Sequence, residues 1–168
     1  MGDELVNKVA ASNLVSIDLE EFADKHPVAE LDIRMQLVNG LLLREKDFRE
    51  FISSHNWEQY KNANVAVYCS TDAIIPKWAF MLVAQALQPF ASMVVFGTRE
   101  VLETVLFQQA LSKINPEDYR DKRIVVKGCG DKEVPVAAYV EITRLLTPVA
   151  KSIMYGEPCS TVPVFKRK

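Results

Sequence analysis

The chain has 168 residues, 49% of them hydrophobic, and its 20 Lys and Arg against 22 Asp and Glu leave a net charge of -2. This composition suits a globular domain with a proper core, and the charge gives no electrostatic reason to expect nucleic acid as a partner. No apolar run reaches the roughly 20 residues that cross a bilayer, and the first residues lack a signal-peptide pattern. We therefore expect a cytoplasmic protein with no membrane partner.

The first 45 residues predict strands at the edge of a sheet. Residues 14–19 alternate between apolar and polar side chains, as a half-buried strand does. Residues 31–43 alternate on either side of Asn39-Gly40, which predicts a hairpin with a primed turn. A short helix that ends at Gly40 is the alternative, because Ile33 and Leu37 also fit a helical stripe.

From residue 45 onward the pattern becomes regular. Apolar runs predict strands at 64–69, 92–96 and 123–127. Helical spacing of apolar residues predicts helices at 45–54, 76–87, 99–114 and 135–155. We expect Pro148 to kink the last helix and Gly156 to end it.

This alternation predicts an α/β fold with three layers, in which helices cover both faces of a mostly parallel sheet. The N-terminal strands would lie at its edge, and antiparallel pairing is open for them. We expect a single domain over residues 1–168. Its parts are the edge segments at 1–45, a helix and three βα units at 46–155, and a tail at 156–168.

Two strand ends carry the same pattern: a cysteine ends the strand, an acidic residue follows in the turn, and a proline begins the next helix. The members are Cys69, Asp72 and Pro76 in one turn and, with one residue of slip, Cys129, Asp131 and Pro135 in the other. Shared α/β packing is the simpler explanation. Parallel strands of one sheet end at one edge, so we expect both thiols there, about 5 Å apart on neighbouring strands or about 10 Å with one strand between them.

The third thiol, Cys159, follows the predicted last helix and reaches this edge only if the chain turns back after Gly156. In a reducing compartment the three cysteines stay free, and thiolates near helix N-termini suit a soft metal or an iron–sulfur cluster. The predicted metal ligands are Cys69, Cys129 and Cys159. The groups expected around a bound cofactor are Gly128, Gly130, Asp72 and Asp131.

Three other interpretations stay open. Each cysteine can be a small apolar core residue, which is the commonest role of a free cysteine. Cys129, between two glycines, can act alone as the nucleophile of a small-molecule or anion-binding enzyme. The chain can also be a non-catalytic scaffold. No Cys-x-x-Cys occurs, and neither His26 nor His55 stands at metal-binding spacing, so zinc would need a ligand beyond the thiols.

Segments 43–49, 73–79 and 151–163, the last reading KSIMYGEPCSTVP, resemble a bacterial family of proteins known as domain-of-unknown-function family 2480. The resemblance covers nearly the whole chain and implies no established activity. Genes of this family often lie near those of the SUF iron–sulfur assembly pathway, which implies a role in sulfur or cluster handling. We therefore expect an accessory protein with iron–sulfur assembly proteins, and a second copy of the chain, as candidate partners.

Overall fold

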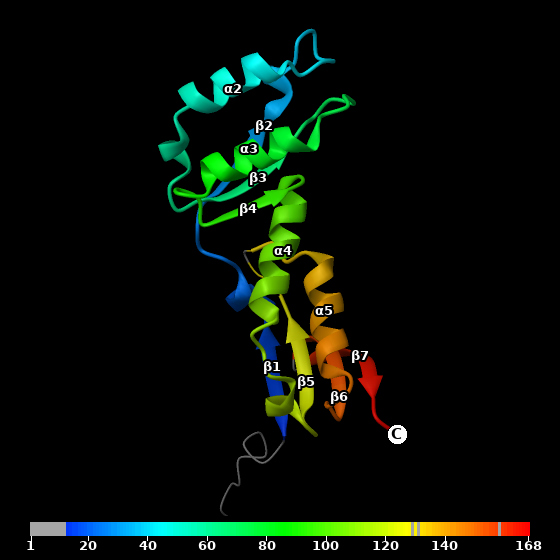
Figure 1. Cartoon of the computed structure of the whole chain (residues 1–168). Coiled ribbons are helices and arrows are strands. Elements are labelled where there is room, and N and C mark those ends of the chain that lie inside the picture. The colour runs from blue at the N-terminus through cyan, green and yellow to red at the C-terminus, as the bar shows by residue number, and fades with distance from the viewer. Residues whose placement is uncertain (1–12, 129, 131, 158) are drawn as a thin grey trace, which may run out of the picture. The chain divides into compact units, whose positions relative to one another are not determined.

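A computed structural model describes residues 13–128, 130, 132–157 and 159–168 (Figure 1). Within them the strands are β1 (Leu14–Asp18), β2 (Val28–Asp32), β3 (Asn64–Tyr68), β4 (Met93–Phe96), β5 (Arg123–Lys127), β6 (Ser152–Glu157) and β7 (Ser160–Lys166). The α-helices are α2 (Glu45–Ser54), α3 (Lys77–Leu87), α4 (Arg99–Leu111) and α5 (Val136–Leu146). Short 3₁₀-helices are η1 (Leu19–Phe22), η2 (Ile33–Gln36), η3 (Trp57–Tyr60) and η4 (Pro116–Tyr119). The predicted α/β class with mostly parallel strands is confirmed.

The strands form two sheets, and the prediction of a single sheet is wrong. Sheet A has the order β1-β5-β6-β7, in which only β7 is antiparallel to its neighbour. Sheet B has the order β2-β3-β4 and is parallel throughout. Antiparallel pairing of the N-terminal strands is also wrong, because β1 and β2 run parallel to β5 and β3. Strand order depends on pairing between distant segments, which local periodicity does not record.

The chain divides into two compact units, each built on one sheet. Unit 1 holds sheet A and comprises the chain up to Asp24 together with Leu106–Lys168, while unit 2 holds sheet B and comprises Lys25–Val105. The segment that forms unit 2 is therefore inserted, in sequence, between β1 and β5.

The two units repeat one order of elements. β3 and β5 begin 59 positions apart, at Asn64 and Arg123, and the same separation relates α3 to α5 and β4 to β6. β1 and β2 also correspond, since each ends in an aspartate, Asp18 or Asp32, that caps the following 3₁₀-helix. The constant separation removes the slip assumed in the repeated turn, so position 129 corresponds to Ser70 and not to Cys69.

Each sheet is covered by a helix with the same apolar stripe. Ala79, Val83 and Leu87 of α3 are fully buried against sheet B, and the matching residues of α5 are fully buried against sheet A. A spacing of four residues places such side chains on one side of a helix. Burying each leucine side chain contributes about 1.5–3 kcal/mol, so these stripes hold each helix to its sheet.

The predicted hairpin at 31–43 is wrong, although its turn is present. Asn39 and Gly40 both have positive φ angles, of 52° and 70°, as a primed turn requires. The turn joins only an isolated bridge between Val38 and Leu42. The residues before it form β2 and the 3₁₀-helix η2, so the alternative of a short helix is right in kind, but η2 ends at Gln36 and not at Gly40.

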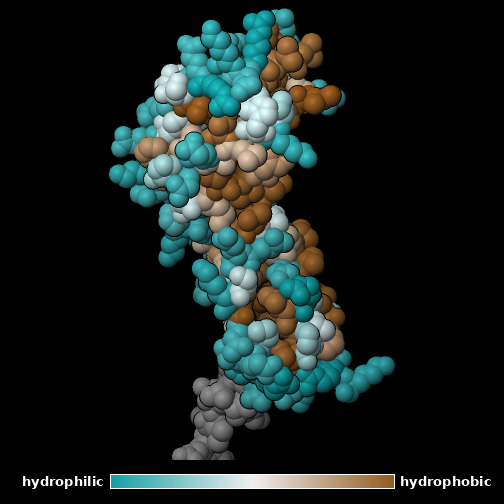
Figure 2. All heavy atoms as spheres, viewed as in Figure 1, coloured by the Kyte–Doolittle hydropathy of each residue, from teal (hydrophilic) through white to brown (hydrophobic). Residues whose placement is uncertain are grey.

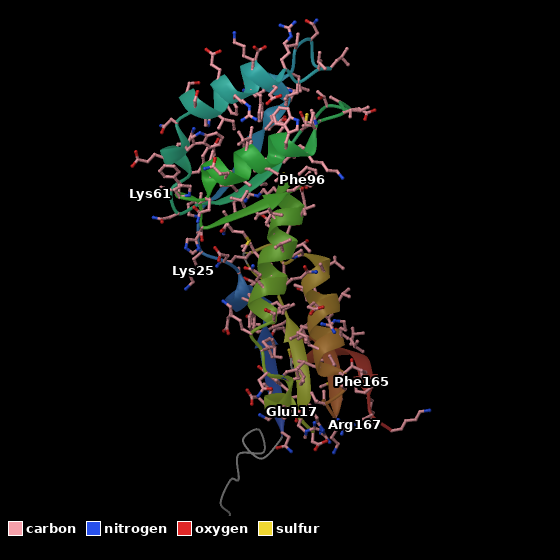
Figure 3. The ribbon with its side chains drawn as sticks, viewed as in Figure 1. Lys25, Lys61, Phe96, Glu117, Phe165 and Arg167 are labelled. Carbon is pink, nitrogen blue, oxygen red and sulfur yellow. The ribbon has the colours of Figure 1, made fainter. Side chains whose placement is uncertain are left out.

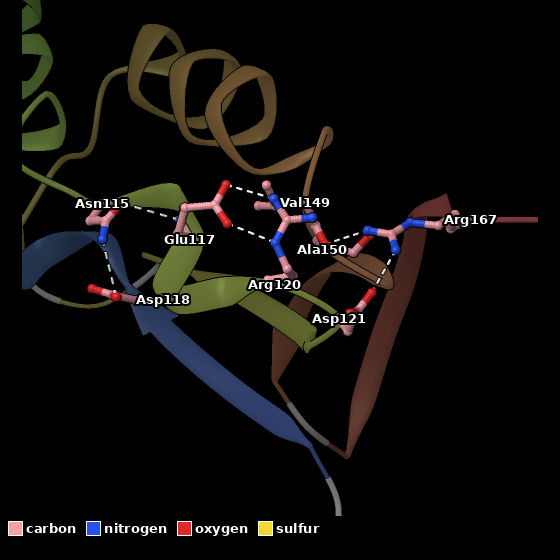
Figure 4. A network of polar contacts seen from close by, with 8 residues as sticks. All are labelled: Asn115, Glu117, Asp118, Arg120, Asp121, Val149, Ala150 and Arg167. Atoms are coloured by element: carbon pink, nitrogen blue, oxygen red, sulfur yellow. Dashed lines mark hydrogen bonds and ion pairs between the residues drawn. The ribbon is translucent and has the colours of Figure 1, made fainter.

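The predicted helix at 135–155 is wrong beyond Leu146, where α5 ends. Pro148 follows, and proline cannot continue a helix because it lacks the backbone N–H. The next residues form β6, and β7 folds back beside it. Arg167 fastens the end of β7, since its guanidinium donates to the carbonyl oxygens of Val149 and Ala150 and pairs with Asp121 at 2.6 Å (Figure 4).

Candidate functional site

The C-terminal edge of sheet A carries a charged group at the end of each parallel strand. Lys127 ends β5, and its Nζ lies 3.2 Å from the carboxylate of Asp18 on β1 and 4.0 Å from that of Glu157 on β6. The hydrogen bond that Lys127 donates to Asp18, followed by the charge of Glu157, raises the pKa of Lys127. Lys127 therefore stays a cation and offsets the two carboxylates.

The turn after β5 receives a carboxylate from η1. Glu20 accepts hydrogen bonds from the backbone N–H groups of Gly130 and, at 3.3 Å, of Lys132. A Cβ atom on Gly130 would lie 2.5 Å from a Glu20 oxygen, so a larger residue here would make the Glu20 side chain shift. The group that approaches the backbone of Gly130 is the protein's own carboxylate.

Gly128, the other glycine of this turn, is buried beneath α5. The hydroxyl of Tyr139 donates to its carbonyl oxygen at 2.8 Å. A Cβ atom at Gly128 would lie 2.6 Å from that hydroxyl and 3.3 Å from the Cβ of Leu19. Glycine at position 128 therefore suits the close packing of Tyr139 and Leu19 around it. Cys129 and Asp131 lie outside the described residues.

Cys159 lies in the turn between β6 and β7 and is exposed. β6 is parallel to β5, so its C-terminal end, and the turn that follows, lie at the same edge of sheet A as the end of β5. The helix predicted at 135–155 would have set Cys159 one helix length away, but residues 152–157 form β6. The strand brings this turn to the edge without the tail having to double back.

Cys69 belongs to the other sheet. It follows β3 in unit 2, packs against the core of that unit, and its Sγ lies 3.3 Å from the hydroxyl of Thr71. β3 and β5 are in different sheets, so the argument that set Cys69 and Cys129 at one sheet edge is wrong. Asp72, in the turn between β3 and α3, is exposed.

The equivalent edge of sheet B is held by a hydrogen-bonded aspartate. Asp32 accepts from the backbone N–H of Ser70 at 3.0 Å and from its hydroxyl. Burial acts to raise the pKa of Asp32, but these bonds and one from the N–H of Arg34 outweigh it and lower the pKa. Asp32 is therefore a stable anion that ties β2 to the turn after β3.

Within the described part of the chain, no three His, Cys, Asp or Glu side chains are placed to hold a metal ion. His55 lies at the C-terminal end of α2 among aromatic rings, 4.9 Å from Phe51, 4.6 Å from Trp57 and 5.9 Å from Tyr60 between ring centroids. Burial lowers its pKa.

Unit 1 also contains an apolar groove that the sequence analysis missed. It has a volume of about 520 Å³, within the range of small-molecule sites. Its lining comes from α5 and strands β5, β6 and β7: Val126, Val136, Tyr139, Val140, Thr143, Ile153, Met154, Tyr155 and Val164. Val136 and Val140 of α5 are 77% and 63% exposed. The signal in the sequence was that these two apolar residues lie outside the buried stripe of the same helix.

Comparison with known proteins places this fold in a family. Residues 3–167 match the family described as "Protein of unknown function (DUF2480)". The chain belongs to this family. No curated protein and no solved structure matched the chain. Among the described residues, no helix is long and apolar enough to span a membrane.

Proposed function

We propose that the protein is a cytoplasmic accessory factor of sulfur or iron–sulfur metabolism that works through Cys129 and Cys159. In this proposal the two thiolates bind a soft metal or an iron–sulfur species, or carry sulfur as a persulfide. Thiolate sulfur is the ligand that zinc, copper(I) and iron–sulfur clusters prefer. Iron–sulfur assembly proteins are the proposed partners.

The observation that carries the proposal is the parallel pairing of β5 with β6. Their C-terminal ends are neighbours in sheet A, and neighbouring strands lie about 5 Å apart. Cys129 follows β5 by two positions, and Cys159 follows β6 by two positions. Two sulfur atoms bound to one zinc ion at about 2.3 Å each need a separation of that order.

The neighbouring residues suit a site of transfer more than a closed structural site. Two thiols leave coordination positions open, which a partner protein or a transferred group would fill. At the C-terminal edge of sheet A, the positive charge of Lys127 offsets part of the negative charge of Asp18 and Glu157, with which it pairs. Glu20 accepts hydrogen bonds from the backbone N–H groups of Gly130 and Lys132 at this edge.

The test has three anaerobic arms: reconstitution with iron and sulfide, addition of zinc, and reaction with a low-molecular-weight persulfide, whose outer sulfur passes to a cysteine thiolate while the rest leaves as a thiolate. Elemental analysis follows the first two arms, and measurement of sulfane sulfur follows the third. We expect stoichiometric metal or sulfane sulfur in the unsubstituted protein and its loss in both Cys129→Ser and Cys159→Ser. Cys69→Ser, in the other sheet, is the matched control and should retain the bound species. Protein that stays empty in all three arms would contradict the proposal.

A second candidate rests on the groove. Tyr139 lines the groove and also bonds to Gly128, so the groove adjoins the turn that contains Cys129. In this candidate an enzyme binds the apolar part of a small molecule in the groove and uses Cys129 as nucleophile. Loss of turnover in Cys129→Ser, with Cys159→Ser fully active, would favour it over the thiol-pair proposal.

A further inference from the structure

The outer edges of the two sheets differ although the units repeat one another. In unit 1, β7 pairs with β6 along its whole length, from the Glu157–Ser160 pair to the Ser152–Lys166 pair. Since β5 pairs with the other side, β6 has a partner strand on both sides. In unit 2 the equivalent strand, β4, pairs with β3 alone, and the described residues provide no strand for its other side. The N–H and C=O groups along an unpaired edge form a template for another strand.

An apolar surface accompanies this edge. Phe96 at the end of β4 contacts Phe80 of α3, with ring centroids 4.9 Å apart, and Tyr155 and Tyr139 make the equivalent contact in unit 1. Phe96 and, on α3, Met81 are each 69% exposed. Hydrophobic side chains gather over α3 and β4 in Figure 2, and Figure 3 labels Phe96 at this position.

Charge distinguishes this edge from its counterpart. Residues 78–98, which include α3 after its first residue and all of β4, contain no Asp, Glu, Lys or Arg. The equivalent stretch of unit 1, residues 137–157, contains Glu141, Arg144, Lys151 and Glu157. Monomeric proteins commonly protect an edge strand with lysine, proline or an inward charge, or by keeping it short. β4 is short, with four residues, but it has no lysine, proline or charge.

We propose that β4 pairs with β4 of a second copy of this chain, in antiparallel orientation, so that two copies of sheet B form one continuous sheet. A two-fold axis between the strands makes the contact self-complementary, and it satisfies both unpaired edges at once. Self-pairing brings the uncharged segment 78–98 of one copy against the same segment of the other, so no like charges meet. In unit 1 the strand equivalent to β4 already pairs in this way, because β7 lies antiparallel to β6.

The test is the mass of the full-length protein in solution, measured by light scattering after size exclusion over a range of concentrations. We expect a dimer, and we expect Phe96→Glu to weaken it at least about tenfold because equal charges then face each other across the pairing. Phe96→Lys should do the same, and an equimolar mixture of the two variants should dimerise again. Recovery in the mixture also shows that each variant is folded.

Tyr155→Glu is the matched control, because it changes the equivalent position of unit 1, where β7 already covers the strand. We expect it to leave the dimer intact. A monomer at every concentration would overturn the proposal, even if the surface bound another protein. A dimer that withstands Phe96→Glu, or one that Tyr155→Glu disrupts equally, would overturn it as well.

Discussion

The hydroxyl of Tyr139 lies 2.8 Å from the carbonyl oxygen of Gly128 and only 2.6 Å from the place where a Cβ atom on Gly128 would stand. The position of the Tyr139 hydroxyl thus leaves no room for a side chain at position 128. Gly128→Ala should lower the free energy of unfolding by about 1–3 kcal/mol, the usual cost of overpacking. Urea denaturation measures this change.

A double-mutant cycle separates this clash from other effects. Tyr139→Phe alone should cost about 1 kcal/mol, because it removes one hydrogen bond. In Gly128→Ala with Tyr139→Phe the hydroxyl is gone, so the double variant should be more stable than the sum of the two single changes predicts. Strict additivity would show that the two residues do not interact.

Glu20 fixes the turn after β5 through the N–H groups of Gly130 and Lys132. We expect Glu20→Ala to lower the free energy of unfolding by about 1–2 kcal/mol, since it leaves charge-assisted hydrogen bonds unmade. The neighbouring Glu21 is exposed, and Glu21→Ala should change stability by less than about 0.5 kcal/mol. Equal effects at the two positions would argue against this role of Glu20.

His55 makes stability depend on pH. Burial lowers its pKa from 6.5, so the unfolded chain binds a proton at a higher pH than the folded chain does. Stability is therefore lost as the pH falls below about 6.5 and continues to fall until His55 is protonated in the folded state. In His55→Gln, urea midpoints between pH 7 and pH 5 should decline less steeply; an unchanged slope would exclude His55 as the cause.

Asp32 should make stability depend on pH in the acid range. Its pKa is lowered in the folded state, so the stability it contributes is present above its unfolded pKa of about 3.8 and is lost as the pH falls through the folded value. We expect Asp32→Asn to be less stable than the unsubstituted protein by about 1 kcal/mol at pH 7, with the difference shrinking below pH 4. A difference that does not change with pH would contradict this assignment.

Local features of the sequence predicted the elements well. The runs at 64–69 and 123–127 became β3 and β5, because their β-branched and apolar residues suit a buried parallel strand. Pro76 precedes α3 and Pro135 precedes α5 as expected. The prediction of a helix after Pro148 was wrong, because the apolar residues of this segment fit a helical stripe as well as they fit the strand β6.

The pairing between distant segments could not be predicted. Nothing local to residues 14–18 or 28–32 indicates that β1 pairs with β5 while β2 pairs with β3, and this choice separates Cys69 from sheet A. The parallel pairing of β5 with β6, which makes their C-terminal ends neighbours, could not be predicted either. The groove also depends on β7, whose contact with β6 the sequence analysis did not foresee.

The most direct test of a shared thiol site is whether Cys129 and Cys159 can form a disulfide with each other. The fully reduced protein would be oxidised briefly with diamide, digested, and mapped by mass spectrometry. The account predicts an intramolecular disulfide between Cys129 and Cys159, with Cys69 left as a free thiol. Failure of these two cysteines to link, or preferential linkage of either one to Cys69, would contradict a shared thiol site at the edge of sheet A.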